Sequence, residues 1–140
     1  MRSGNLLFDE SHMWVRLEDD DTAVMGLSDY AQDMMGEIIF VELPEEGAAI
    51  IRGDACGTVE SVKSVEDLLA PASGEVVRVN EDVLDAPETI NEDPYGDGWL
   101  IEVKLEDKSE LESLMTESEY ESFLDSLEGE REEEEEEEEF

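Results

Sequence analysis

Lysine, histidine and cysteine are scarce in this chain. Its 140 residues include 43 acidic residues, but only 8 lysines and arginines together, 1 histidine and 1 cysteine. The single cysteine, Cys56, excludes an internal disulfide, and its simplest interpretation is a small buried thiol in a strand. A nucleophilic cysteine needs a base, and nothing in the sequence places His12 beside it. The common zinc, nucleotide and serine-hydrolase motifs are missing too, so we expect neither catalytic residues nor a metal site.

Long apolar runs and a basic surface are missing as well. No stretch approaches the ~20 apolar residues of a membrane span, and residues 1–10 are too acidic for a targeting leader. The formal net charge of −35 opposes contact with nucleic acid and with anionic membranes, because both carry the same sign. The acid would suit basic partner surfaces, or a salty cytoplasm that screens self-repulsion. We therefore expect a cytoplasmic protein that binds neither nucleic acid nor membrane.

Short apolar and β-branched runs, separated by glycine and proline turns, predict a mainly β domain. The expected strands are residues 13–17, 22–27, 37–43, 55–62, 65–70, 75–79 and 99–105. Ser28 is expected to cap a short helix near 28–35, which Gly36 ends. Residues 80–98 are rich in acid and proline and are expected to form a connection. Many short strands of this kind are typical of a small sandwich or barrel.

The C-terminal third changes from strand-like to helix-like sequence. Two capping-box patterns are present, Ser109-x-x-Glu112 and Thr116-x-x-Glu119. An apolar helical face follows at Tyr120, Phe123, Leu124 and Leu127. We predict two short helices packed on the β-core, within one domain that spans residues 1–128. The remaining segment, 129–140, is mostly glutamate, and because adjacent like charges repel and bury nothing, we predict a disordered acidic tail.

Among the few lysines, Lys63 has the most informative position. Residues 59–67 alternate between apolar and polar up to a turn at Lys63-Ser64, which predicts a hairpin with this ammonium group at its tip. A catalytic amine would need burial, which a hairpin tip does not provide. A second interpretation is an ordinary surface lysine. A third is a site of covalent cofactor attachment, presented on a folded hairpin to a modifying enzyme. The pattern alone leaves these interpretations open.

Several motifs along the chain occur in the same order in one known family. The hairpin motif consists of Glu60, Ser61, Val62, Lys63 and Ser64 after Val59, with Asp67 four residues beyond the lysine. The other motifs lie at 11–16 (Ser-His-Met-Trp-Val-Arg), 26–32, 36–44, 70–76, 91–100 and 111–120. Together they resemble the glycine cleavage H-protein family from about residue 8 to 127. The glutamate tail lies outside the resemblance.

The resemblance implies a mainly β, barrel-sandwich hybrid fold with lipoic acid in amide linkage to Lys63. It implies a monomeric, non-catalytic carrier of the aminomethyl group of glycine. The carrier would receive this group from a pyridoxal-phosphate-dependent glycine decarboxylase (P protein) and pass it to an aminomethyltransferase (T protein). Dihydrolipoyl dehydrogenase (L protein) would reoxidise the arm, and a lipoate ligase or transferase would attach it. Biotin carriers share the fold, but their lysine lies between methionines, unlike Val62 and Ser64 here.

The resemblance also implies a cleft that holds the loaded arm, with Ser11, Met13, Tyr30 and Asp67 as candidate lining residues. The family has glutamate where Met13 stands and frequently histidine where Tyr30 stands. Methionine cannot accept the hydrogen bonds of an aminomethyl cation. One interpretation is drift at two tolerant positions. An alternative is an H-like carrier outside glycine cleavage, either a lipoyl relay or a lipoate-binding protein of sulfur oxidation. A third is a structural or regulatory module that has lost its arm.

Overall fold

The computed structural model describes residues 6–138 of the chain, and side chains over residues 6–128. Its strands are β1 (Leu6–Phe8), β2 (Met13–Leu17), β3 (Thr22–Leu27), β4 (Ile38–Glu42), β5 (Ala49–Ile50), β6 (Ala55–Ser61), β7 (Val65–Leu69), β8 (Gly74–Val79), β9 (Ile101–Leu105) and β10 (Met115–Thr116). Its helices are α1 (Asp29–Met35), α2 (Glu81–Asp85), α3 (Glu88–Glu92), the 3-10 helix η2 (Lys108–Ser113) and α4 (Glu117–Glu138). The mainly β prediction is confirmed, and each expected strand is present within two residues at either end.

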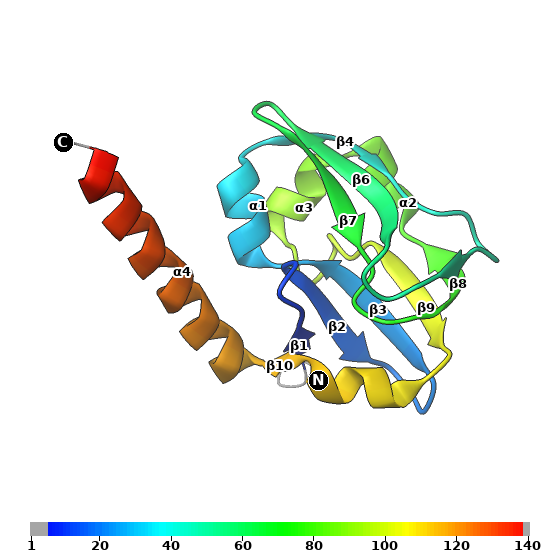
Figure 1. Ribbon diagram of the computed structural model, residues 1–140. Coiled ribbons are helices and arrows are strands. Elements are labelled where there is room, and N and C mark those ends of the chain that lie inside the picture. Colours follow the sequence, from blue (N-terminus) through cyan, green and yellow to red (C-terminus); the bar gives the residue numbers. More distant parts are fainter. Residues whose placement is uncertain (1–5, 139–140) are drawn as a thin grey trace.

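Two antiparallel sheets enclose the core (Figure 1). The larger has the order β10-β1-β2-β3-β9-β8-β5, and the smaller has the order β4-β6-β7. Alternate residues of the strands point inward, as a two-residue period requires, so that Val15 and Val103 of the large sheet share one buried cluster with Ile38 and Val59 of the small one. Full burial of a side chain of this size contributes roughly 1.5–3 kcal/mol. This shared cluster fixes the small sheet, and with it the β6–β7 hairpin, on the larger one.

Helix α1 begins and ends as the sequence predicts. The Ser28 side chain accepts a hydrogen bond from the Ala31 amide, which satisfies one of the free N–H groups of the first turn. Gly36 ends the helix with φ of 79°, a left-handed conformation that a residue with a Cβ adopts only at a cost. The Asn91 side-chain amide donates to the Gly36 carbonyl and so fixes this end against α3.

The connection 80–98, expected without regular structure, contains the two short helices α2 and α3. Asn80 caps α2 by accepting a hydrogen bond from the Asp82 amide. Each helix buries one apolar residue completely, Val83 in α2 and Ile90 in α3. Five residues are too few for a helical period to be recognised in the sequence, so the prediction missed elements that tertiary packing stabilises.

The C-terminal segment differs from the prediction in two respects. The first expected helix is the 3-10 turn η2, and Asp107 caps it by accepting from the Ser109 amide, so the Ser109 capping box does not form. The second expected helix is α4, which continues to Glu138, whereas the sequence predicted disorder from residue 129. Glutamate has a good helix propensity, and a packed first turn removes the cost of nucleation. Figure 1 shows α4 projecting away from the two sheets. Residues 139–140 of the predicted tail lie outside the described part.

The first turn of α4 packs its apolar face against the larger sheet. Thr116 and Glu119 form the predicted capping box, in which each side chain accepts a hydrogen bond from the backbone amide of the other residue. Tyr120 is buried and stacks on Phe8 of β1, with ring centroids 4.3 Å apart. In residues 6–138 no helix is both long and apolar enough to cross a membrane.

Candidate functional site

Lys63 lies at the tip of the β6–β7 hairpin, as predicted, and Ser61 organises the turn. The Ser61 hydroxyl accepts hydrogen bonds from the amides of Lys63 and Ser64, each at 3.1 Å. The Ser61 amide donates to the Ser64 carbonyl at 2.8 Å. Only 4% of Ser61 is exposed, whereas Lys63 is exposed. A buried hydroxyl therefore fixes the turn and presents an accessible ammonium group in one orientation.

The tip is attached to the segment that follows α1. The Val62 amide donates to the Glu37 carbonyl at 3.1 Å. The stem of Lys63 lies over Gly36, where a Cβ atom would come within 3.2 Å of the lysine Cε. Gly36 thus leaves room for the lysine stem beside the end of α1. Lys104 on β9 and Lys108 in η2 are also exposed, but neither occupies a hairpin tip.

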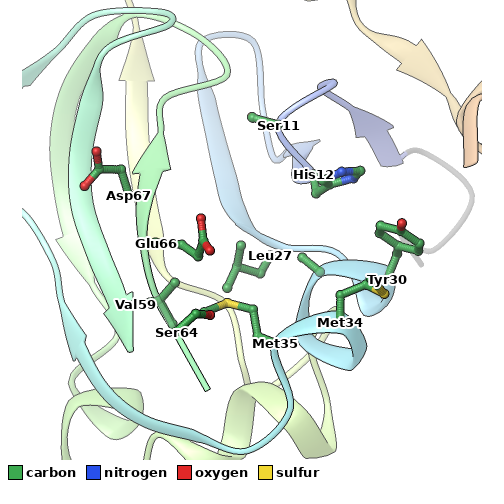
Figure 2. A pocket seen from close by; sticks show the side chains of 11 residues that line it. Ser11, His12, Leu27, Tyr30, Met34, Met35, Val59, Ser64, Glu66 and Asp67 are labelled. Atoms are coloured by element: carbon green, nitrogen blue, oxygen red, sulfur yellow. The ribbon is translucent and has the colours of Figure 1, made fainter. Parts of the chain in front are cut away.

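A cleft of about 400 Å³ opens beside the tip, between the small sheet and α1 (Figure 2). Ser64 of the turn is one of its lining residues, so the tip and the cleft are continuous. Leu27, Val59 and Met35 form much of its apolar lining. A cavity of this volume with apolar walls and a few polar groups is typical of a site for a small molecule or a flexible arm.

Three of the four candidate cleft residues line this cleft, and the fourth does not. Ser11, Tyr30 and Asp67 are lining residues. Met13 is not among them, because it lies in the buried core with only 1% of its surface exposed. Its backbone is paired with Leu27 in the β2–β3 ladder, where a buried side chain packs into the shared core. The substitution of methionine for glutamate therefore changes the core and removes no lining residue from this cleft.

Two polar lining residues, His12 and Glu66, were not predicted from the sequence. Glu66 pairs with Val59 in the β6–β7 ladder, and directly opposed residues lie on the same face of a sheet. Val59 faces the cleft, so Glu66 does as well, whereas Asp67 must point to the other side of β7. Figure 2 shows the Glu66 carboxylate directed toward Leu27 and the Asp67 carboxylate directed away from it. The pairing register of the hairpin contains this information, whereas the polarity of Glu66 does not, because an apolar–polar alternation would place it on the face opposite Val59.

His12 forms part of the cleft wall and is held by several contacts. Its backbone has φ of 71°, which is unusual for a residue other than glycine. Its Nδ1 atom lies 2.8 Å from the Tyr120 hydroxyl, and its ring lies 4.9 Å from the ring of Tyr30. Burial lowers the pKa of His12 below its ordinary value, although the Asp9 carboxylate opposes this shift. The lowered pKa favours the neutral imidazole.

The other candidate reactive groups of the chain support no chemistry of their own. Cys56 is partly buried, and burial raises the pKa of its thiol to about 11, so the thiolate is scarce at neutral pH. Over the described side chains, no group of three or more histidine, cysteine, aspartate or glutamate residues has a geometry that could hold a metal ion. The site therefore consists of an exposed lysine, a rigid turn and an adjoining cleft.

Comparisons with known proteins agree with this geometry. The model of the family described as glycine cleavage H-protein matches residues 6–127. The chain belongs to the glycine cleavage H-protein family. It is 48% identical to the glycine cleavage system H protein of Idiomarina loihiensis over 121 residues, which cover 86% of this chain and 94% of the relative. It is 52% identical to the H protein of Vibrio vulnificus over 115 residues, covering 82% and 91%.

A solved member of the family has the same architecture. The crystal structure of an H protein from Mycobacterium marinum matches with a TM-score of 0.78 and 39% identity, covering 84% of this chain and 94% of that one. With two antiparallel sheets and several short helices, the H-protein-like chain has the barrel-sandwich hybrid fold that the sequence predicted. The family match ends at residue 127, ten residues after the start of α4.

Proposed function

We propose that this protein is the non-catalytic lipoyl carrier of a glycine cleavage system, with lipoic acid in amide linkage to Lys63. It would carry the aminomethyl group of glycine from the P protein to the T protein. The observation that carries the proposal is the continuity of an exposed lysine at a rigid hairpin tip with a cleft beside it. The membership of the H-protein family supports the same conclusion.

The residues present fit a lipoyl group. When bound, a lipoyl group would supply a dithiolane whose S–S bond opens, so that one sulfur bonds the aminomethyl carbon and the other becomes a thiol. The exposed Lys63 amine is accessible to an attaching enzyme, and the absence of a Cβ atom at Gly36 leaves space for the stem. The apolar walls at Leu27, Val59 and Met35 suit the hydrocarbon part of the arm.

The polar lining suits a cationic cargo. An ammonium group is a donor without an acceptor, and the Glu66 carboxylate faces the cleft to accept from it. His12 is neutral and does not repel a cation. We infer that the Glu66 carboxylate binds the aminomethyl group and that the neutral His12 does not repel it.

A lipoyl carrier outside glycine cleavage is the second candidate, either a lipoyl relay or a sulfur-oxidation protein. It was motivated by Met13, where the family has glutamate. Since Met13 lies in the core and Glu66 supplies a carboxylate to the cleft, the substitution gives no reason to exclude an aminomethyl cargo. We therefore favour glycine cleavage.

The proposed partners are the P, T and L proteins and a lipoate ligase or transferase. The net charge of −35 would steer the carrier toward basic surfaces on these enzymes. Action as a cytoplasmic monomer, with a domain boundary near residue 128, remains a prediction.

Intact-mass spectrometry after co-expression with a lipoate ligase tests the attachment site. The wild-type chain should gain the mass of one lipoyl group, and Lys63→Arg should gain none while unfolding with an unchanged midpoint, because an exposed tip residue contributes little to stability. Lys108→Arg is the matched control, since it removes another exposed lysine outside the hairpin. An unmodified wild type, or a modified Lys63→Arg, would refute the assignment.

A further inference from the structure

A chain of hydrogen bonds connects the cleft wall to the C-terminal helix. The His12 Nδ1 atom lies 2.8 Å from the Tyr120 hydroxyl, which lies 2.7 Å from the Ser28 hydroxyl. The Ser28 hydroxyl also accepts a hydrogen bond from the Ala31 amide at 3.1 Å. His12 lines the cleft, whereas Tyr120 belongs to α4 and is not a lining residue. These hydrogen bonds therefore link α4 to the cleft, and His12 is the member whose side chain lines the cleft.

The need to satisfy each buried hydroxyl fixes the direction of these bonds. Ser28 is completely buried, and over the described side chains the acceptor available to its hydroxyl proton is the Tyr120 oxygen. Leaving a buried donor unpaired costs roughly 1–3 kcal/mol, so Ser28 donates to Tyr120. Tyr120 remains protonated, because burial raises its pKa to about 12. Its own proton then goes to its other partner, the His12 Nδ1 atom.

This direction selects one tautomer of His12. An Nδ1 atom that accepts a hydrogen bond carries no proton, so the neutral ring carries its proton on Nε2. Protonation of Nδ1 would leave Tyr120 facing two donors, from Ser28 and from His12, and would deprive its own proton of an acceptor. The hydrogen bonds and the burial of the ring thus both oppose the cationic form.

Other titratable groups face His12 from the elements around it. They are Asp9 in the preceding turn, Tyr30 on α1, Tyr120 on α4 and Glu66 on β7 across the cleft, whereas the carboxylate of the lining residue Asp67 points away. The carboxylates favour the imidazolium ion, whereas the burial of the ring and the hydrogen bond from Tyr120 favour the neutral form.

We propose that Tyr120 is a positioning residue, which holds His12 neutral with its proton on Nε2 and thereby keeps the cleft free of positive charge. Through Tyr120, helix α4 would thus contribute to the cleft that holds the lipoyl arm. The proposal deepens the proposed function and rests on it where the cargo is concerned, because a cationic aminomethyl group would be repelled by an imidazolium ion in the same cleft.

The tautomer can be measured in the full, unmodified chain. His12 is the only histidine, so the nitrogen NMR shifts of its ring can be assigned without ambiguity. The wild type should show an unprotonated Nδ1 and a protonated Nε2. In Tyr120→Phe, which retains the stacking on Phe8, we expect a mixture of tautomers and a titration midpoint above that of the wild type, because the hydrogen bond that opposes protonation of Nδ1 is lost while the burial of the ring remains.

Two further variants complete the test. Tyr95→Phe is the matched control, because it also removes a tyrosine hydroxyl bound to the start of α1, at the Asp29 amide, without touching His12. It should leave the tautomer unchanged. Ser28→Ala removes the donor that orients Tyr120 and should weaken the tautomer preference even if Tyr120→Phe fails to fold. A wild type with Nδ1 protonated, or a tautomer insensitive to both Tyr120→Phe and Ser28→Ala, would overturn the proposal.

The consequence for the cargo is measured separately, on lipoylated protein loaded with the aminomethyl group. At pH 6.5 Tyr120→Phe should lose its cargo about two- to fivefold faster than wild type and Tyr95→Phe, as loss of a partly exposed electrostatic contribution predicts. Equal rates would contradict the link to the cargo. Because the NMR measurement needs no lipoyl group, a failure of the proposed function is distinguishable from a failure of the hydrogen-bonded chain.

Discussion

At the scale of single residues, the cleft combines one inward carboxylate with a neutral imidazole. Glu66 lies on the same face of the small sheet as Val59, and His12 lies on the opposite wall. A carboxylate that accepts from an ammonium group forms a charge-assisted hydrogen bond, which is stronger than a neutral one. Asp67 also lines the cleft, but its carboxylate points away from Leu27. Glu66 and Asp67 are thus both carboxylates, but only the Glu66 carboxylate is directed into the cleft.

This difference predicts the effect of removing each charge. In lipoylated, loaded protein, Glu66→Gln should release the cargo about two- to fivefold faster, because an exposed ion pair contributes up to about 1 kcal/mol. Asp67→Asn is the matched control and should change the rate little. The measurement is the release of ammonia over time. A larger effect for Asp67→Asn than for Glu66→Gln would contradict the assignment of Glu66.

The residues of the site were partly predictable from the sequence. The position of Lys63 was predictable, because alternation and a turn place it at a hairpin tip. Ser11 and Tyr30 were placed in the cleft through the family resemblance, and the structure agrees. Met13 was expected there too, but the structure places it in the buried core behind the lining, since how deep a strand residue lies depends on how the two sheets pack. Local pattern contains no information on that packing.

At the scale of elements, α4 is fixed by its first turn. Thr116 and Glu119 cap each other's backbone amides, and Tyr120 follows at once in a buried position against Phe8. The cap therefore positions the residue that contacts His12. The exposed capping box thus stabilises the hydrogen bond between Tyr120 and His12, which lines the cleft.

Loss of this cap should destabilise the domain measurably. Thr116→Ala removes the hydroxyl that accepts from the Glu119 amide, and we expect the free energy of unfolding to fall by about 1 kcal/mol. Thr116→Ser retains a hydroxyl and should lose little. Urea denaturation of the two variants beside wild type is the measurement. Equal stability of Thr116→Ala and wild type would show that the capping box does not stabilise α4.

The elements that the sequence predicted well are those with several independent sequence features close together. The strands on both sides of Lys63 and helix α1 have alternation, caps and turn residues within a few positions, and each formed. Helices α2 and α3 are too short to show a period and depend on burying Val83 and Ile90. The extension of α4 to Glu138 was not predicted, because like-charge repulsion in the glutamate run and the helix propensity of glutamate act in opposite directions.

At the scale of the whole molecule, negative charge surrounds a small apolar site. The net charge of −35 is distributed over the domain as well as the C-terminal segment, so long-range steering would draw basic partner surfaces toward the carrier from many directions. The exposed lysine at the hairpin tip would lose its own positive charge on amide formation. Recognition by each partner would then rely on the acidic surface and on the arm.

The exchange of labelled bicarbonate into glycine tests the central claim most directly. Lipoylated wild-type protein, mixed with the P protein, should support this exchange, because in the proposed function an arm on Lys63 would accept and return the aminomethyl group. Lys63→Arg should be inactive although folded, and Lys108→Arg should match wild type. If lipoylated wild-type protein supports no exchange, or if Lys63→Arg supports as much as wild type, the protein is not a carrier of glycine cleavage that works through Lys63.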